Sequence, residues 1–228
     1  MNVDDLKRQA ALKAVELVQS GMIVGLGTGS TAVHAIHAIG EHLAHGRLHQ
    51  ILAIPTSHTA AQEAQRCGIP LTTLTNHPQV DITIDGADEI DPHLNLIKGL
   101  GGALLREKIV AVASKQLLII ADDSKRVEQL GSHAPVPVEV IPFAQAPAAH
   151  YLQSLGANVV LRLKNGEPFI TDEGNIILDC YFDLIADPLR LVQAIRQQPG
   201  IVEHGLFLGI ATKAIIASFR GIEILSRP

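Results

Sequence analysis

Three carboxylates lie within the six residues DGADEI (85–90), directly after the apolar segment VDITI. Carboxylates can transfer protons to and from a substrate in general acid–base catalysis. The alternative is a turn in which Asp85 and Asp88 cap the backbone that follows. We expect Gly86 to allow a sharp turn, Asp85 and Asp88 to point inward, and Glu89 to face solvent or a neighbouring helix.

The segment GLGTGSTA (25–32) follows an apolar strand and begins a helical pattern. Gly27, Gly29 and Ala32 satisfy a loose dinucleotide-binding pattern, but that site needs an acidic residue after the next strand, and PTSHT supplies none. A Walker loop is absent, because no Gly-Lys-Ser/Thr follows. A glycine-rich turn with hydroxyl groups at a helix N-terminus can bind phosphate; the alternative is a tight turn with a Ser/Thr N-cap. The hydroxyl residues are Thr28, Ser30 and Thr31.

The segment KGLGGALLREK (98–108) is a second candidate for anion binding. Its glycines free the backbone just before a helix, and Lys98 supplies a cation. The helical pattern predicts an apolar stripe, with Glu107 on roughly the opposite side. Taken alone, Glu107 is typical of a solvated helix glutamate, but its position about one turn after a glycine-rich loop favours a role in a site. The stripe consists of Leu104, Leu105, Ile109 and Val112.

Lys125, in ADDSKRV, also follows an apolar strand. In an open parallel sheet the carboxyl ends of the strands share one edge, and ligands bind beside that edge. The loops that contain Thr28, Asp85 and Lys125 each follow such a strand. We therefore interpret these three polar loops as parts of one site.

Five histidines in and just after the second helical segment have i,i+3 and i,i+4 spacings that can bind a metal ion. They fall on the side of the helix opposite its apolar residues, and Gly40 and Gly46 interrupt the helix. We therefore favour a solvated face and expect no metal site. The five are His34, His37, His42, His45 and His49.

Apolar strands and helical segments alternate through the first half of the chain, which predicts an α/β fold with parallel strands and helical crossovers. The predicted strands span residues 22–27, 49–54, 71–74, 80–84 and 116–121, and the predicted helices span 4–20, 30–45, 57–67 and 103–115.

The prolines of GSHAPVPVEVIP (131–142) indicate a boundary, after which the predicted order is β-α-β-β-α-β, the ferredoxin-like split motif. The apolar tail GLFLGIATKAIIASF is expected to return to the first sheet. We predict one domain from residues 1–131 and 206–228 and a second from residues 132–205. The second domain's predicted strands are 136–141, 158–163, 176–182 and 201–208, with helices at 144–155 and 188–197 and a hairpin at 172–175.

The composition is that of an ordinary globular protein, with 47% hydrophobic, 18% charged and 3% aromatic residues. A net charge of −5 and few aromatic residues argue against nucleic-acid binding. No apolar run reaches the length of roughly 18 residues that a membrane span needs, and the N-terminus is a charged amphipathic segment. The separated Cys67 and Cys180 do not suggest a disulfide framework. We expect a soluble, cytoplasmic protein.

Taken together, these segments resemble the ribose-5-phosphate isomerase A family. GLGTGSTA, DGADEID, KGLGGALLREK, ADDSK and VPVEVIPFA occur in that family's order and approximate spacing, and LGA, DEGNIILD and PGIVEHGLF continue the resemblance through the second half. The family implies a Rossmann-like domain with a ferredoxin-like α/β insertion near the C-terminus, assembled as a homodimer or homotetramer. It also implies interconversion of D-ribose 5-phosphate and D-ribulose 5-phosphate, in the non-oxidative pentose phosphate pathway, with no metal or organic cofactor.

The resemblance also implies residue roles. Glu107 matches the general base, and Asp85, Asp88 and Lys98 match polar groups around the reacting end of the sugar. Isomerisation moves a proton between adjacent carbons through a cis-enediolate, for which a carboxylate base and a cation near the developing oxyanion are appropriate. Which loop holds the phosphate stays open. The implied substrate-binding residues are Thr28, Gly29, Ser30, Thr31, Asp85, Gly86, Ala87, Asp88, Lys98, Gly99, Leu100, Gly101 and Lys125.

The sequence departs from the family pattern in the glycine run, where Leu100 stands, and in ADDSK, where Asp123 adds negative charge. The side chain of Leu100 either narrows the loop or points away from it. A second functional class is a non-catalytic sugar-phosphate sensor. Such a protein needs the phosphate loop but does not need the four catalytic candidates together, namely Glu107, Asp85, Asp88 and Lys98. A third is a sugar-phosphate deaminase or lactonase of similar fold, which lacks the DGADEI…KGLGG…REK series.

Overall fold

The computed structural model describes residues 2–227, which divide into two compact units. The first unit extends from the N-terminus to Ala87 and also contains Arg106–Lys125 and the chain from Ile210 onward. The second unit contains Asp88–Leu105 and Arg126–Gly209. The domain boundaries predicted after residues 131 and 205 stay predictions.

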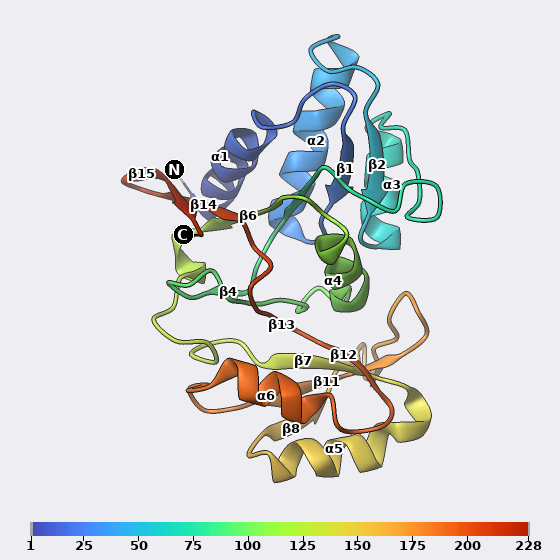
Figure 1. Ribbon diagram of the computed structural model, residues 1–228, viewed down its shortest axis with the longest axis vertical. Helices are drawn as coiled ribbons and strands as arrows, with labels where there is room; N and C mark the ends of the chain where they lie inside the picture. Colours follow the sequence, from blue (N-terminus) through green and yellow to red (C-terminus); the bar gives the residue numbers. More distant parts are fainter. Residues whose placement is uncertain (1, 228) are drawn as a thin grey trace. The chain divides into compact units, whose positions relative to one another are not determined.

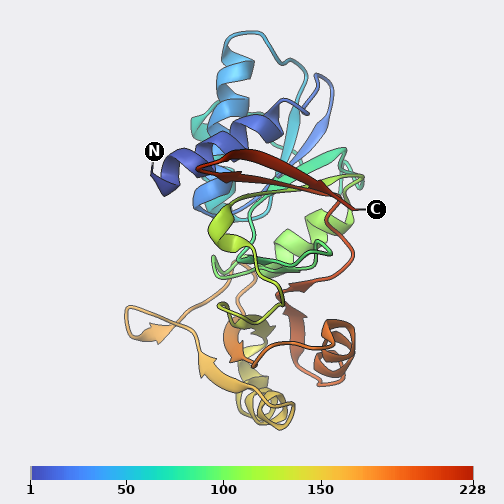
Figure 2. The same cartoon turned by 90° about the vertical axis from the view of Figure 1, so that its left-hand side faces the viewer.

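The first unit is built on a six-stranded sheet with the order β15-β14-β6-β3-β1-β2. Neighbouring strands are parallel from β14 to β2, and only the terminal strand β15 is antiparallel, paired with β14 in a hairpin (Figures 1 and 2). The mixed α/β fold with a central parallel sheet is therefore confirmed. The strands are β1 (Ile23–Leu26), β2 (Leu52–Pro55), β3 (Ile82–Asp85), β6 (Leu117–Asp122), β14 (Lys213–Ser218) and β15 (Gly221–Ser226).

Helices cover both faces of this sheet, because its strands are apolar on both sides. One face, which includes Val24 and Leu26, packs against α1 (Val3–Val15), α2 (Ser30–Ala44) and α3 (His58–Arg66). The other face packs against α4 (Leu104–Val112), whose Val110 joins a core cluster with Ile54 and Val80. No helix within residues 2–227 is both long and apolar enough to cross a membrane.

The second unit contains an antiparallel sheet with the strand order β12-β7-β11-β8 (Figure 1). Its apolar face packs against two helices, and the elements follow one another in the predicted β-α-β-β-α-β order. They are β7 (Val136–Val140), α5 (Gln145–Ser154), β8 (Asn158–Leu161), β11 (Ile176–Tyr181), α6 (Pro188–Ile195) and β12 (Ile201–His204). A three-stranded sheet contains β4 (Glu89–Ile90), β5 (Leu96–Ile97) and β13 (Leu206–Phe207).

Several predicted elements differ from the structure. The predicted strand at 71–74 is reduced to a single bridge between Leu71 and Ala53, and β15 was not predicted. A short hairpin of β9 (Leu163–Lys164) and β10 (Glu167–Pro168) interrupts the second half. Its turn is Asn165-Gly166, and both residues have positive φ. Asn-Gly is a strong signal for a hairpin turn, but the sequence prediction did not use it. The short 3-10 helices are η1 (Asp123–Lys125) and η2 (Pro142–Ala144).

The prediction that Glu89 faces solvent or a helix is wrong. Its side chain is fully buried in β4 and accepts hydrogen bonds from three backbone N–H groups, those of Gly131 (2.7 Å), His133 (2.5 Å) and Ala134 (2.8 Å). A loop distant in sequence thus supplies the donors that a buried carboxylate requires, and no local sequence pattern around Glu89 predicts them.

We expect the substitution Glu89→Ala to lower the free energy of unfolding by about 2–3 kcal/mol, because three backbone N–H groups lose their acceptor. Urea unfolding followed by circular dichroism measures the change. Glu128→Ala, at an exposed position of the same unit, is the matched control and should stay within about 0.5 kcal/mol of the wild type. Equal stability of the two variants would show that the Glu89 contacts contribute nothing.

Candidate functional site

The strand order places a topological switch point between β1 and β3. From β1 the chain continues to β2 on one side, whereas β3 pairs with β1 on the other side. At such a point the loops that follow the two strands separate, and a ligand can bind between them beside the carboxyl ends. In this chain those loops are the Thr28 loop and the DGADEI segment.

The Thr28 loop is held by hydrogen bonds at the ends of β2 and β3. The N–H of Gly27 donates to the carbonyl of Ile84 (2.9 Å), and the hydroxyl of Thr28 contacts those of Thr56 (2.7 Å) and Ser57 (2.8 Å). Thr56 and Ser57 follow β2 directly, so the strand-end rule could have identified them from the sequence. They fix the orientation of the loop that leads into α2.

The N-terminus of α2 has no side-chain cap. Gly29, the N-cap residue, has φ +107°, a value that favours glycine, and makes no side-chain cap hydrogen bond. Lys7 of α1 donates a hydrogen bond to the hydroxyl of Ser30 (2.9 Å) and brings a positive charge to this end of the helix. Sequence reasoning missed Lys7, because it lies in a helix that carries no motif.

Asp85 is the last residue of β3, and its side chain is fully buried. Its Oδ1 accepts hydrogen bonds from the backbone N–H groups of Thr28 (3.2 Å) and Gly86 (2.8 Å). A Cβ atom at Gly27 would lie 2.2 Å from Oδ1 of Asp85 and 2.6 Å from its Cα. The glycine pattern of this loop is therefore required for the close approach of β1 to Asp85, and the inward orientation predicted for Asp85 is confirmed.

Glu107 lies in the first half of α4 and is only 4% exposed. Val110, one turn later, packs directly against Gly25 of β1. A Cβ at Gly25 would lie 2.9 Å from Cγ1 of Val110. A crossover helix runs antiparallel to its strands, so Glu107 lies toward the carboxyl ends of the strands relative to Val110. Glu107 is a buried carboxylate, not a solvated helix glutamate.

The apolar stripe predicted for α4 is wrong in its second half. Ile109 and Val112 are 48% and 69% exposed, whereas Glu107 and Lys108 are buried. The prediction from the helical pattern took the apolar residues to be the buried ones. In the structure, the buried face of the helix instead carries charged residues together with Val110 and Ala111.

Lys125 ends η1, directly after β6, and is partly buried. Because β6 pairs in parallel with β3, this loop lies at the same edge of the sheet as Asp85. Asp122 orders the loop by accepting from the N–H (3.1 Å) and the hydroxyl of Ser124. Asp123, the unusual residue of this segment, is exposed. The first unit thus contains Thr28, Gly29, Ser30, Thr31, Asp85, Gly86, Ala87, Glu107 and Lys125.

The second unit contains Asp88, Lys98, Gly99, Leu100 and Gly101. Asp88 accepts a hydrogen bond from the N–H of Leu100 (3.0 Å), which links the DGADEI segment to the glycine-rich loop. Lys98 is 2% exposed, and its Nζ lies 5.5 Å from the centroid of the Phe207 ring, a cation–π contact. Leu100 is 44% exposed.

Arg162 anchors the glycine-rich loop of the second unit, and sequence reasoning missed it. Its Nη1 donates to the carbonyls of Gly99 (2.8 Å) and Leu100 (3.1 Å), while Nε and Nη2 donate to Asp179. Gly99 has φ +104°, and a Cβ at Gly102 would lie 2.3 Å from the ring of Phe169. No motif surrounds Arg162, so only the fold reveals that it holds this loop.

The histidine-rich helix carries none of these residues beyond its first turn. His37 is exposed, as predicted, whereas His34 and His42 are partly buried. His45 and His49 are exposed but lie beyond the end of α2 at Ala44. Gly40 does not interrupt the helix as predicted, because α2 continues to Ala44.

We expect Gly27→Ala to lower the free energy of unfolding by about 2–3 kcal/mol, since the new methyl group would overlap Asp85 and force β1 and β3 apart. Gly86→Ala is the control: no atom lies within 4 Å of a Cβ there and its φ is not positive, so we expect a change within about 0.5 kcal/mol. Thermal and urea unfolding measure both. A tolerated Gly27→Ala would mean that the loop can move away at little cost.

Known proteins similar to this chain were identified by sequence and by structure. Residues 52–221 match the family model described as ribose 5-phosphate isomerase A (phosphoriboisomerase A). Ribose-5-phosphate isomerase A of Roseiflexus castenholzii is 53% identical over 223 residues, covering 97% of this chain and 95% of the relative. That of Gloeobacter violaceus is 54% identical over 227 residues, covering 99% and 98%.

Two solved structures agree with this assignment. A D-ribose-5-phosphate isomerase in complex with phospho-erythronic acid superimposes with a TM-score of 0.97 at 39% identity, covering all of both chains. The ribose 5-phosphate isomerase from Plasmodium falciparum gives 0.95 at 43% identity, covering 98% of each chain. The sequence and the fold therefore agree, and the chain belongs to the ribose-5-phosphate isomerase A family.

Proposed function

We propose that this chain interconverts D-ribose 5-phosphate and D-ribulose 5-phosphate. The observation that carries the proposal is the match, across nearly the whole chain, to relatives named ribose-5-phosphate isomerase A. A structural relative is described with phospho-erythronic acid bound, a phosphorylated acid whose planar carboxylate has the charge and shape of an enediolate. A phosphorylated sugar that passes through an enediolate is therefore the substrate we assign.

We propose Glu107 as the general base that moves the proton between C1 and C2 of the sugar. A carboxylate that is 4% exposed is shielded from bulk water, which keeps a proton taken from one carbon available for the next. Protonation of the adjacent carbon of the cis-enediolate by the same residue completes the isomerisation. No metal or organic cofactor is needed for this proton transfer.

Lys98, Asp85 and Asp88 complete the proposed catalytic group. Lys98 would stabilise the negative oxygen that develops in the enediolate, and the two aspartates would transfer hydroxyl protons, open the furanose ring or orient Lys98. Although these residues belong to two compact units, Asp88 follows Ala87 directly in the chain. We assign both sets to one substrate because the family resemblance implies it.

The remaining candidates would bind the sugar and its phosphate. The uncapped N-terminus of α2 and the Lys7–Ser30 contact favour the loop of Thr28 to Thr31 as the phosphate site. The rest are Gly86, Ala87, Gly99, Leu100, Gly101 and Lys125. The proposal includes a cytoplasmic location and assembly as a homodimer or homotetramer, as the family resemblance implies.

We expect Glu107→Gln to lower kcat about 100-fold or more, because an amide cannot accept the substrate's proton. Formation of ribulose 5-phosphate from ribose 5-phosphate measures the rate. Glu41→Gln, at an exposed position of α2, is the control and should keep wild-type activity. Turnover within a few-fold of wild type in Glu107→Gln would contradict the base assignment.

Tight sugar-phosphate binding without turnover by the wild-type chain would instead support the sensor alternative.

Arg162→Lys should raise KM about ten-fold with a smaller change in kcat. Lysine keeps the charge but lacks the planar fork that reaches Asp179 and the two loop carbonyls together, so the glycine-rich loop loses its fixed position. Arg196→Lys, at an exposed arginine of the same unit, is the matched control. Unchanged KM and kcat in Arg162→Lys would exclude a positioning role.

A further inference from the structure

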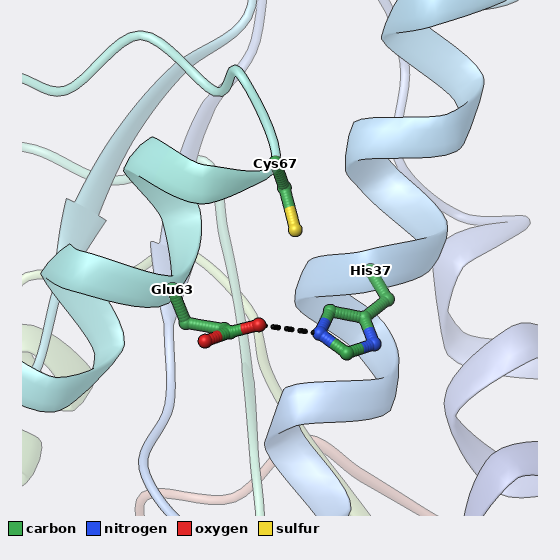
Figure 3. A group of neighbouring side chains, drawn as sticks. All are labelled: His37, Glu63 and Cys67. Atoms are coloured by element: carbon green, nitrogen blue, oxygen red, sulfur yellow. Dashed lines mark hydrogen bonds and ion pairs between the residues drawn. The ribbon is translucent and has the colours of Figure 1, made fainter.

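A group of three metal-ligating side chains lies between α2 and α3 (Figure 3). It contains His37 of α2, Glu63 of α3 and Cys67, the residue that caps α3. One ligand atom from each residue lies within 4.8 Å of the other two, and Nε2 of His37 is 2.6 Å from Oε1 of Glu63. None of the three belongs to the candidate isomerase site.

The backbone holds these residues together. Gly40 lies one turn after His37, and a Cβ there would come within 2.7 Å of Cβ of Cys67 and 2.8 Å of its carbonyl oxygen. The glycine therefore lets the C-terminal end of α3 lie directly against α2. Glu63 and Cys67 are four residues apart, so their side chains project from the same side of α3. The arrangement follows from helix packing and does not depend on flexible loops.

The charge and chemistry of the group are those of a site for a borderline-soft divalent cation. A carboxylate and a thiolate carry two negative charges, and a neutral imidazole supplies a third ligand atom of a type that zinc prefers. Burial and the carboxylates of Glu63 and Glu41 raise the pKa of the Cys67 thiol, because negative charge near the sulfur disfavours a thiolate that no cation balances. The same negative charge attracts a cation.

We propose that His37, Glu63 and Cys67 bind one Zn²⁺ ion, with water as the fourth ligand. Tetrahedral zinc has Zn–N, Zn–O and Zn–S distances of about 2.0–2.3 Å, which places the ligand atoms roughly 3.3–3.8 Å from one another. The His37–Glu63 pair, now at 2.6 Å, must therefore open slightly, and ligand atoms as far apart as 4.8 Å must close by about 1 Å. His37 is exposed, and its hydrogen bond to Glu63 is the side-chain contact that zinc would replace. On binding, the bonds to zinc replace the His37–Glu63 hydrogen bond, the thiol proton leaves to solvent, and the complex carries no net charge.

The hydrogen bond that Arg66 makes to Glu63 agrees with this assignment. Arg66 donates to Oε2 of Glu63 (2.9 Å) and leaves Oε1, the oxygen nearer His37, to the metal. Figure 3 shows the thiol of Cys67 pointing toward the His37–Glu63 pair. The chain's other cysteine, Cys180, is fully buried with a pKa raised to about 12, so it does not compete for zinc.

Zinc bound here would cross-link α2 and α3. Ligand binding to the folded state alone raises stability as the ligand concentration exceeds Kd. We therefore expect ZnCl₂ to raise the Tm of the full chain by a few degrees and MgCl₂ at the same concentration to leave it unchanged, since Mg²⁺ prefers oxygen ligands.

The experiment titrates ZnCl₂ into the metal-free full chain against a chromophoric chelator. We expect Cys67→Ser and His37→Ala to weaken zinc binding about ten-fold or more. The control is His34→Ala. His34 lies on the same helix, and its Nε2 is 3.1 Å from Oδ1 of Asp4, but this pair has no cysteine beside it. Replacing His34 should therefore leave the zinc affinity unchanged. Circular dichroism verifies that each variant is folded.

Cobalt supplies an independent readout of the sulfur ligand. Co²⁺ bound through Cys67 should give a thiolate-to-cobalt charge-transfer band in the near ultraviolet, and Cys67→Ser should abolish it. Wild-type zinc affinity in both Cys67→Ser and His37→Ala would overturn the proposal, as would a cobalt complex of the wild type without that band.

Discussion

Asp85 Oδ1 accepts hydrogen bonds from the N–H groups of Thr28 and Gly86, and through this contact the ends of β1 and β3 are joined. A fully buried carboxylate needs such donors, because burial without hydrogen bonds is costly. The N–H of Thr28 comes within reach only because Gly27 has no side chain. The hydroxyl contacts of Thr28 with Thr56 and Ser57, and the entry into α2, then follow from the fixed position of the loop.

The second unit fixes its loop in a different way. Side chains order its glycine-rich segment. The guanidinium of Arg162 donates hydrogen bonds to two carbonyls of the segment, and the carboxylate of Asp88 accepts a hydrogen bond from one of its N–H groups. Lys98, at the start of the loop, is buried beside the ring of Phe207. The two units therefore present their candidate residues on prearranged backbones, as catalysis by fixed dipoles and charges requires.

The sequence predicted most elements of both units to within a few residues, because apolar periodicity and glycine positions are local properties. It also identified Thr28, Asp85, Glu107 and Lys98 as candidates. It failed where a polar side chain is buried by a distant segment: Glu89 receives its hydrogen bonds from the loop after Leu130, and the buried face of α4 carries charge. Arg162 and Lys7 were missed for the same reason, since their partners are far away in the chain.

The sequence by itself determined the order of the main strands and helices, the glycine-rich loops at the strand ends, and the set of motifs that place it in the isomerase family. These features depend on neighbouring residues, and local sterics and periodicity decide them. Only the tertiary structure decided which charged groups are buried, which backbone groups hold them, and that His37, Glu63 and Cys67 come together. The physical reason is that burial and hydrogen bonding depend on segments far apart in the chain, which meet only when the sheets and helices pack.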